Sequence, residues 1–203
     1  RGANRYAPEN TPQAVRKAAD LGADYIEIDI RTTKDGKFYL LHDSSLNRTT
    51  NGIGPFKDQS ADHVAKLDCG SWFGKPFAGT PVPTFEEGLM ALGDISHVYL
   101  DAKDIPPSEL LAAIRRHRLE ARHVVYQSAE YCRTLKSLDP TVRLLPPLKN
   151  PQMLDGLLDL KPYGVDANWD ILSKEVIARC HAAGIQVFSD ALGRHETIDD
   201  YRK

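Results

Sequence analysis

Hydrophobic and polar positions along this chain repeat in one order: a helix, a glycine and then a strand. The first such unit begins at Thr11, a helix cap before Pro12, and its helical pattern ends at Gly22, directly before the strand "DYIEIDI". The last unit has a helical stripe over residues 176–183, which Gly184 ends before the strand "IQVFSD". Helical and strand patterns of hydrophobic residues therefore alternate from one end of the chain to the other.

Further units of the same kind lie between these two. Thr84 and Glu87 form the pattern of a capping box, which predicts a helix over residues 84–93 before the strand "HVYLDAK". Ser108 is expected to open another helix before "HVVYQS", and the strands "VRLLPPL" and "GVDANW" enclose the helical "PQMLDGLLDL". Six strands alternating with helices favour a parallel sheet with helices outside it.

Two α/β folds fit this alternation, an open doubly wound sheet and a closed TIM (β/α)₈-type barrel. The short, regular units and the lack of a glycine-rich phosphate loop after a first strand favour the barrel. A barrel usually needs about 250 residues and at least roughly 200, and this chain has 203. We therefore expect a single barrel domain over residues 1–203 that is incomplete at both chain ends.

Residues 43–80 break the alternation. They are polar and rich in glycine, with no long apolar period, and they follow the hairpin "TTKDGKFYLLH", whose turn is Asp35-Gly36. Long insertions on a barrel commonly carry function. We interpret this segment as an insertion into the barrel.

The amino-acid composition argues against several classes of protein. Hydrophobic residues make up 41% and charged residues 27%, as in a soluble globular protein, and the net charge of -2 gives no reason to expect nucleic acid or anionic membranes as partners. No apolar run approaches the ~20 residues of a membrane span. Cys69, Cys132 and Cys180 match neither a disulfide framework nor a zinc pattern, so we expect buried, apolar side chains. Compartment and oligomeric state are left open.

Candidate chemistry begins with two acidic residues in a hydrophobic strand, Glu27 and Asp29. Residues at i and i+2 of a strand point to the same side, with α-carbons ~6.5 Å apart. Carboxylates so close repel each other unless a cation lies between them, and oxygen ligands select Mg²⁺ or Ca²⁺. The alternative to a metal site is a strand whose acidic residues face water. Strands of a parallel barrel are covered on both faces, so the barrel argues against this alternative.

Asp101 and Lys103 repeat this spacing on a later strand. Asp101 could complete a site with three carboxylates, and Lys103 could neutralise an anionic substrate oxygen; a surface ion pair is the alternative. His42 follows a run that should be buried, where a histidine is either structural or a proton donor and acceptor near a bound phosphate. Arg1 has a guanidinium suited to phosphate, or belongs to a disordered terminus.

Two tryptophans are candidates for a substrate pocket. Trp72 lies in "GSWFG" and Trp169 ends "GVDANW", and each could line a pocket wall or simply pack in the core. We assign no catalytic or metal-binding role to the remaining histidines.

Five ordered motifs together resemble one known family. "RGANRYAPENT", "GADYIEIDIRTTKDG", "LLHDSSLNRTTNGIG", "GSWFG" and "VPTFEEGL" are closely similar to the glycerophosphodiester phosphodiesterase family. The resemblance covers residues 1 to about 103 and, more loosely, the later units. It implies a TIM barrel with a small inserted subdomain, and hydrolysis of glycerophosphodiesters to glycerol 3-phosphate and an alcohol such as choline, ethanolamine or glycerol.

The resemblance also implies roles for individual residues. One divalent cation, Mg²⁺ or Ca²⁺, would be held by Glu27, Asp29 and Asp101, and it would hold the phosphate. By the same motifs His42 is one of two catalytic histidines, and Arg1 and Lys103 contact the phosphate. In the family the substrate's own neighbouring hydroxyl is thought to attack first, giving a cyclic phosphate that water then opens.

The sequence departs from the family pattern in three places. The family's opening motif is His-Arg-Gly, so the second histidine would come immediately before Arg1. The third metal position is usually Glu, and Asp101 is one methylene shorter, so the ion must shift or take a water; the related spider sphingomyelinase D group also has Asp-x-Lys here. Asp190 occupies the place of a pocket tryptophan, which alters the wall that faces the alcohol.

Two other functions stay open. The same site could cleave a lysophospholipid or sphingolipid in the manner of a phospholipase D, which an apolar rim around the insertion would favour, although the insertion is mainly polar. A non-catalytic phosphodiester-binding barrel would explain the altered third ligand and the missing tryptophan. The joint presence of Glu27, Asp29, His42 and Lys103 argues against that last possibility.

Overall fold

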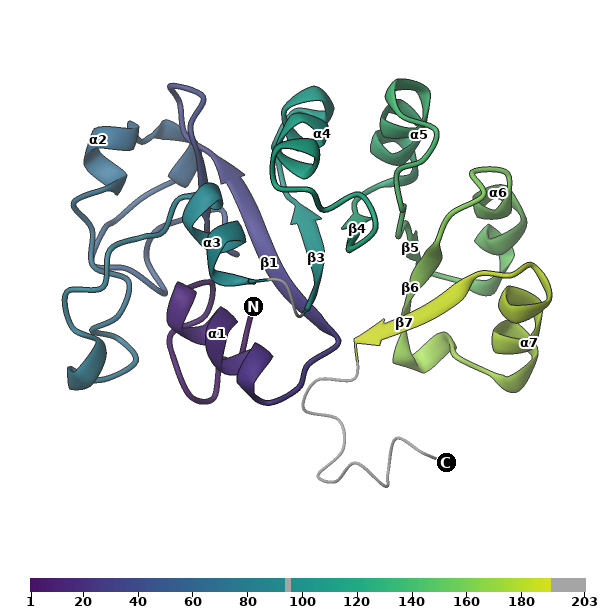
Figure 1. The fold of residues 1–203 in the computed structure, drawn as a ribbon, viewed down its shortest axis with the longest axis horizontal. Coiled ribbons are helices and arrows are strands. Elements are labelled where there is room, and N and C mark those ends of the chain that lie inside the picture. Colours follow the sequence, from purple (N-terminus) through teal and green to yellow (C-terminus); the bar gives the residue numbers. More distant parts are fainter. Residues whose placement is uncertain (94–95, 191–203) are drawn as a thin grey trace. The chain divides into compact units, whose positions relative to one another are not determined.

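The computed structural model describes residues 1–93 and 96–190 as parallel strands alternating with helices (Figure 1). Contacts divide the chain into two compact units, Arg1–Val124 and Val125–Lys203. No helix within the described ranges has both the length and the apolar character needed to cross a bilayer.

The first unit contains a sheet of four strands, of which the last crosses the unit boundary at Val124. Its elements are α1 (Pro12–Asp20), β1 (Tyr25–Thr32), β2 (Phe38–Leu40), η1 (Phe56–Asp58), α2 (Ala61–Val64), η2 (Lys75–Phe77), α3 (Phe85–Ala91), β3 (His97–Ala102), α4 (Pro107–Arg116) and β4 (His123–Tyr126). The strand order is β2-β1-β3-β4, with β2 antiparallel to β1 at the edge and β3 parallel to β1. Figure 1 shows β1 and β3 side by side.

The second unit has a smaller, parallel sheet of order β5-β6-β7. Its elements are α5 (Ala129–Leu138), β5 (Pro147–Leu148), η3 (Pro151–Met153), α6 (Leu154–Leu158), β6 (Gly164–Asn168), η4 (Trp169–Ile171), α7 (Lys174–Ala182) and β7 (Gln186–Asp190). All six strands predicted from the alternation are therefore present, and the α/β class is confirmed.

The helix ends agree with the capping patterns in most places. The Thr11 hydroxyl accepts a hydrogen bond from the backbone N–H of Ala14 at 3.3 Å, which caps α1. At α3, Thr84 accepts from the N–H of Glu87 at 3.2 Å, and the Glu87 carboxylate accepts from the N–H of Thr84 at 2.8 Å. The predicted capping box is thus complete in both directions.

The predicted start of α4 was wrong. The helix begins at Pro107, after the N-cap residue Pro106, so Ser108 lies in the first turn and does not cap it. Proline suits the first helical position because its missing N–H would have no partner there in any case. The two prolines, and not the serine, therefore mark where this helix begins.

The core of the first sheet explains which way its acidic residues point. Ile26, Ile28 and Ile30 are at most 1% exposed, so one face of β1 packs against the interior. Because side chains alternate along a strand, Glu27 and Asp29 lie together on the other face. The three cysteines are buried and unpaired, as expected.

Segment 43–80 contributes to a small apolar cluster. The members are Tyr39, Leu41, Leu46, Phe56, Val64, Leu67, Cys69 and Val82. The two ends of the segment are close together, because Tyr39 bridges to Thr84 and the N–H of Leu40 donates to the carbonyl of Pro83 at 2.9 Å. The segment therefore leaves the sheet and returns to it at neighbouring points.

Candidate active site

Three carboxylates meet on the two central strands of the first sheet. The parallel register of β1 and β3 places Asp29 directly beside Asp101, and Glu27 lies two residues before Asp29 on the same face. One oxygen from each of the three side chains lies within 4.8 Å of the other two. Asp29 is fully buried and Asp101 nearly so, while Glu27 is half-buried.

The carboxylates differ in how readily they ionise. The pKa of Glu27 is raised to about 7, mainly by burial, and the negative charges of Asp29 and Asp101 act in the same direction. Burial also raises the pKa of Asp101, despite its ion pair with the Lys103 ammonium. A cation between these groups would favour the ionised form of both.

Asp29 is held as a carboxylate by its neighbours. Burial alone would raise its pKa, but the Lys103 ammonium and the Asn10 amide more than offset this, so the pKa of Asp29 lies below its ordinary value. The Asn10 amide donates to Asp29 Oδ2 at 2.7 Å, and its carbonyl accepts from the Asp29 N–H at 3.0 Å. Asn10 does so with a left-handed φ of 59°, which asparagine adopts more readily than most residues.

The second oxygen of Asp29, Oδ1, is paired with a cation. Oδ1 is buried and has no hydrogen bond within the described residues; the Lys103 ammonium, 3.1 Å away, forms an ion pair with it. A buried carboxylate oxygen in this state, beside two further carboxylates, suits a hard divalent cation. The donor set of Glu27, Asp29 and Asp101 therefore fits a metal ion.

Two cations lie against these carboxylates. Lys103 pairs with both Asp29 and Asp101; burial lowers the pKa of its ammonium, but the two acids raise it more, so it remains charged. The Arg1 guanidinium lies 3.6 Å from Asp29 through Nε and 3.4 Å from Glu9 Oε1 through Nη1. Both positive groups predicted from the sequence are thus next to the acidic cluster.

His42 lies shortly after β2, where its backbone is held by a neighbouring strand. The Arg31 guanidinium donates to the His42 carbonyl at 2.8 and 3.2 Å. The imidazole Nδ1 lies 2.8 Å from Asp43 Oδ1. The nearby His42 contributes to the lowered pKa of Asp29, so the imidazole is within electrostatic reach of the cluster.

An ion-pair chain, His42–Asp43–Arg48–Glu9–Arg1, joins this histidine to the carboxylate cluster. Arg48 donates two hydrogen bonds to Asp43, both at 2.8 Å, and two to Glu9 at 2.8 and 2.9 Å. These bonds hold the pKa of Asp43 far below its usual range. Asp43, Arg48 and Glu9 were not predicted, because the ion-pair chain is completed by the pairing of Arg48 with Glu9, 39 residues apart.

The predicted pocket residues are spread over both units. Trp72 is 44% exposed, donates from its indole N–H to the Cys69 carbonyl at 2.8 Å, and packs edge-on against Phe73 with ring centres 5.6 Å apart. Trp169 is half-buried at the end of β6. Asp190 ends β7 beside Asn168, and its side chain lies outside the described part of the chain. Their roles as pocket walls stay predictions.

Helices alternating with parallel strands, and three carboxylates on neighbouring strands, define an α/β protein with a candidate metal site. The model of the Glycerophosphoryl diester phosphodiesterase family matches residues 1–202. The chain belongs to this family.

Relatives of known name are similar over most of the chain. The Glycerophosphodiester phosphodiesterase of Bacillus subtilis (strain 168) is 36% identical over 211 residues, covering 91% of this chain and 72% of the relative. A glycerophosphodiester phosphodiesterase crystal structure from Agrobacterium tumefaciens has a TM-score of 0.81 at 32% identity, covering 93% of this chain and 83% of that one. An Oleispira antarctica phosphodiesterase, solved with the product sn-glycerol-3-phosphate, shares the fold at 22% identity and a TM-score of 0.83, with coverage of 95% and 82%.

Proposed function

We propose that this chain hydrolyses glycerophosphodiesters to glycerol 3-phosphate and an alcohol, with the help of one divalent cation. Its family membership makes it a phosphoric diester hydrolase. The observation that carries the proposal is the cluster of Glu27, Asp29 and Asp101, in which Asp29 is fully buried. The bound product in the Oleispira structure supports the choice of substrate class.

Glu27, Asp29 and Asp101 would hold the ion, which we propose to be Mg²⁺ or Ca²⁺ because all three donors are carboxylate oxygens. When bound, such an ion supplies electrostatic stabilisation for the charge that develops on the phosphate oxygens. Lys103 and Arg1, which flank the carboxylates, are proposed to bind and orient the phosphate from the same side.

His42 is proposed to hold or move the proton. Its Nδ1 faces Asp43, and an N–H donated to this carboxylate leaves Nε2 as the atom that exchanges a proton with the reacting oxygen. Asp43 is in turn fixed by Arg48, so the imidazole is oriented before substrate binds. The second histidine is proposed by family motif alone, at the position before Arg1.

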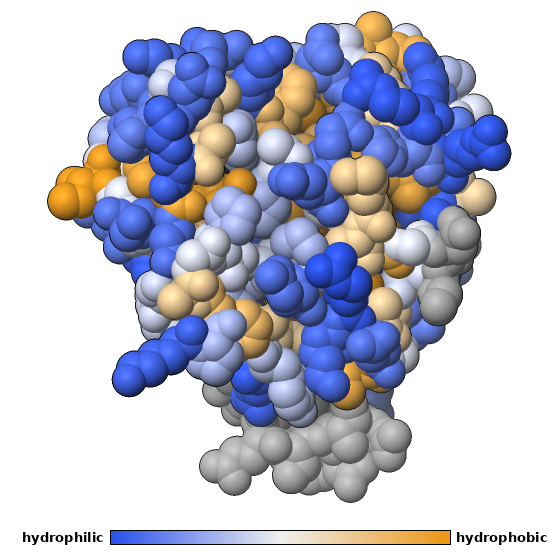
Figure 2. All heavy atoms as spheres, turned by 60° about the vertical axis from the view of Figure 1, so that its left-hand side comes forward, coloured by the Kyte–Doolittle hydropathy of each residue, from blue (hydrophilic) through white to orange (hydrophobic). Residues whose placement is uncertain are grey.

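Phospholipase D-like cleavage of a lysophospholipid or sphingolipid has less support. The large hydrophobic residues exposed in segment 43–80, where the structure describes every residue, are Ile53 at 80% and Trp72 at 44%. Figure 2 shows a face that is mainly hydrophilic, with hydrophobic side chains in small groups. A lipid substrate would favour a broader apolar rim.

We also propose that residues 1–203 form one domain of the (β/α)₈-barrel type, with residues 43–80 as an inserted subdomain. The alternation of helices with parallel strands supports the barrel, as does the likeness to solved family structures over more than nine-tenths of the chain. The apolar cluster to which segment 43–80 contributes supports the subdomain.

Product analysis tests the proposed function. The chain with its native start is incubated with glycerophosphocholine and Mg²⁺, Ca²⁺ or EDTA, and the products are identified by mass spectrometry. We expect glycerol 3-phosphate and choline with a metal and neither product with EDTA. Phosphocholine as product would contradict the reaction proposed, and turnover in EDTA would contradict the metal. No turnover with any metal or head group would favour the non-catalytic binding barrel.

Replacing Arg48 with glutamine is expected to lower kcat by about tenfold with a smaller change in KM. The substitution leaves Asp43 and Glu9 without their shared partner, so His42 is oriented less well while the metal and phosphate groups remain. Steady-state kinetics on glycerophosphocholine measure kcat and KM separately. Arg16→Gln, at an exposed position of α1, is the matched control. An unchanged kcat would show that Arg48 does not position the histidine.

A further inference from the structure

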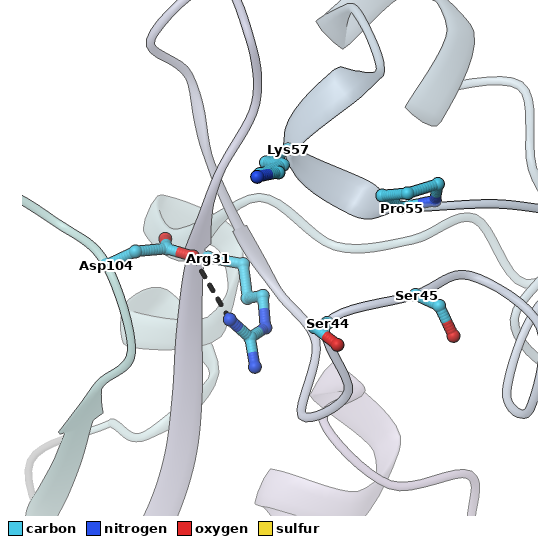
Figure 3. A pocket seen from close by; sticks show the side chains of 6 residues that line it. All are labelled: Arg31, Ser44, Ser45, Pro55, Lys57 and Asp104. Carbon is cyan, nitrogen blue, oxygen red and sulfur yellow. Dashed lines mark hydrogen bonds and ion pairs between the residues drawn. The ribbon is translucent and has the colours of Figure 1, made fainter.

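A cavity of about 340 Å³, lined mostly by polar and charged residues, lies in the first unit, apart from the carboxylates themselves (Figure 3). Its lining residues are Arg31, Ser44, Ser45, Pro55, Lys57 and Asp104. The strand-end residues Arg31 and Asp104 form one part of the lining, and segment 43–80 supplies the rest. None of these residues belongs to the proposed metal site or to the ion-pair chain.

The position of the cavity follows from the chain. Three lining residues come directly after proposed active-site residues: Arg31 follows Asp29 by two positions on the same face of β1, Ser44 follows His42 by two, and Asp104 follows Lys103. Two positions along a strand correspond to ~6.5 Å. The cavity therefore begins about one side chain away from the groups proposed to hold the phosphate.

Backbone pairing fixes the half of the cavity that belongs to segment 43–80. Ser45 forms an antiparallel bridge with Pro55, and the N–H of Phe56 donates to the Ser44 carbonyl at 2.9 Å. Phe56 is fully buried in the apolar cluster, which anchors the short η1 helix. The backbone of Lys57, the next residue, is thereby held in place at the cavity.

Charges within the cavity do not balance. The Arg31 guanidinium is matched by Asp104 at 3.1 Å, and that carboxylate also accepts the Thr32 N–H at 2.6 Å. Lys57 is exposed and forms no ion pair or side-chain hydrogen bond with any residue in the described ranges. One positive charge is left over in a lining that also contains Ser44 and Ser45.

This chemistry favours one kind of head group. Quaternary ammonium groups are recognised by aromatic faces, and the described residues that line the cavity include no aromatic ring. A surplus positive charge repels choline and attracts an anion, while serine hydroxyls can donate to one. We propose that the cavity binds the alcohol moiety of the diester and selects an alcohol that carries an anionic group, such as the carboxylate of serine. This inference rests on the proposed function.

Glycerophosphoserine and glycerophosphoethanolamine test the proposal, because they differ only by that carboxylate. We expect kcat/KM to be about fivefold higher for the serine diester, the size of effect that one partly solvated charge gives. Lys57→Gln should bring the ratio close to one by lowering kcat/KM for the serine diester alone. Lys57→Arg should keep the preference, and so should Lys66→Gln, an exposed lysine elsewhere in the segment.

A ratio that is unchanged in Lys57→Gln would overturn the cavity proposal while leaving the diesterase intact. If neither diester is turned over, the proposed function fails, and calorimetric titration of the same two diesters decides the cavity separately. Tighter binding of the serine diester that depends on Lys57 would then support an anion site. Equal affinities would overturn it.

Discussion

Replacing Asp29 with asparagine is expected to lower kcat/KM for glycerophosphodiesters by roughly 10²- to 10³-fold, the cost of removing one preorganised electrostatic group. The change keeps the shape of the side chain but removes the charge of the most buried donor in the cluster. It also removes one of the acidic partners of the Lys103 ammonium. Metal affinity should fall together with activity, because hard cations prefer charged oxygen ligands.

Steady-state kinetics and calorimetric titration with Mg²⁺ and Ca²⁺ measure both effects on the same variant. Asp20→Asn removes an exposed carboxylate at the end of α1 and should change neither quantity. Circular dichroism shows whether each variant is folded. Metal affinity and kcat/KM within a factor of two of the unmodified protein would exclude Asp29 as a ligand.

His42→Gln should lower kcat by roughly 10²- to 10⁴-fold, the range that general acid–base groups contribute. Glutamine can still form a hydrogen bond with Asp43 but cannot gain and lose a proton at neutral pH. The carboxylates, Lys103 and Arg1 are untouched, so KM and metal affinity should change little.

The control for this variant is His63→Gln, which replaces an exposed imidazole in α2. Kinetics across a range of pH add a second readout, since loss of an acid–base group should flatten one limb of the kcat profile. A fall of less than fivefold, with the profile unchanged, would assign His42 a structural role.

Periodicity predicted the parts of this structure that depend on local sequence. The alternation of helices and strands, the cap at Thr11 and the capping box at Thr84 all follow from residues within one or two turns. The side-by-side placement of Glu27 and Asp29 follows from the geometry of a single strand.

Pairing between distant segments was predicted only in part. Asp101 was expected to join Glu27 and Asp29, but the register that sets it directly beside Asp29 is decided by how β1 and β3 pack, which no local pattern encodes. Asn10 and the Arg48–Glu9 bonds also join separate segments. The apolar cluster went unnoticed because it gathers residues singly from short elements, with no period to detect.

The two ends of segment 43–80 lie close together, so a segment of different length or sequence could connect the same two points of the sheet. Its entry and exit are fastened by the bridge between Tyr39 and Thr84 and by the Leu40–Pro83 hydrogen bond. The entropy of closing a loop grows only slowly with its length, about 0.6 kcal/mol per doubling. Evolution, or a protein engineer building chimaeras, can therefore lengthen, shorten or replace this piece without moving the strands that carry Asp29 and Asp101.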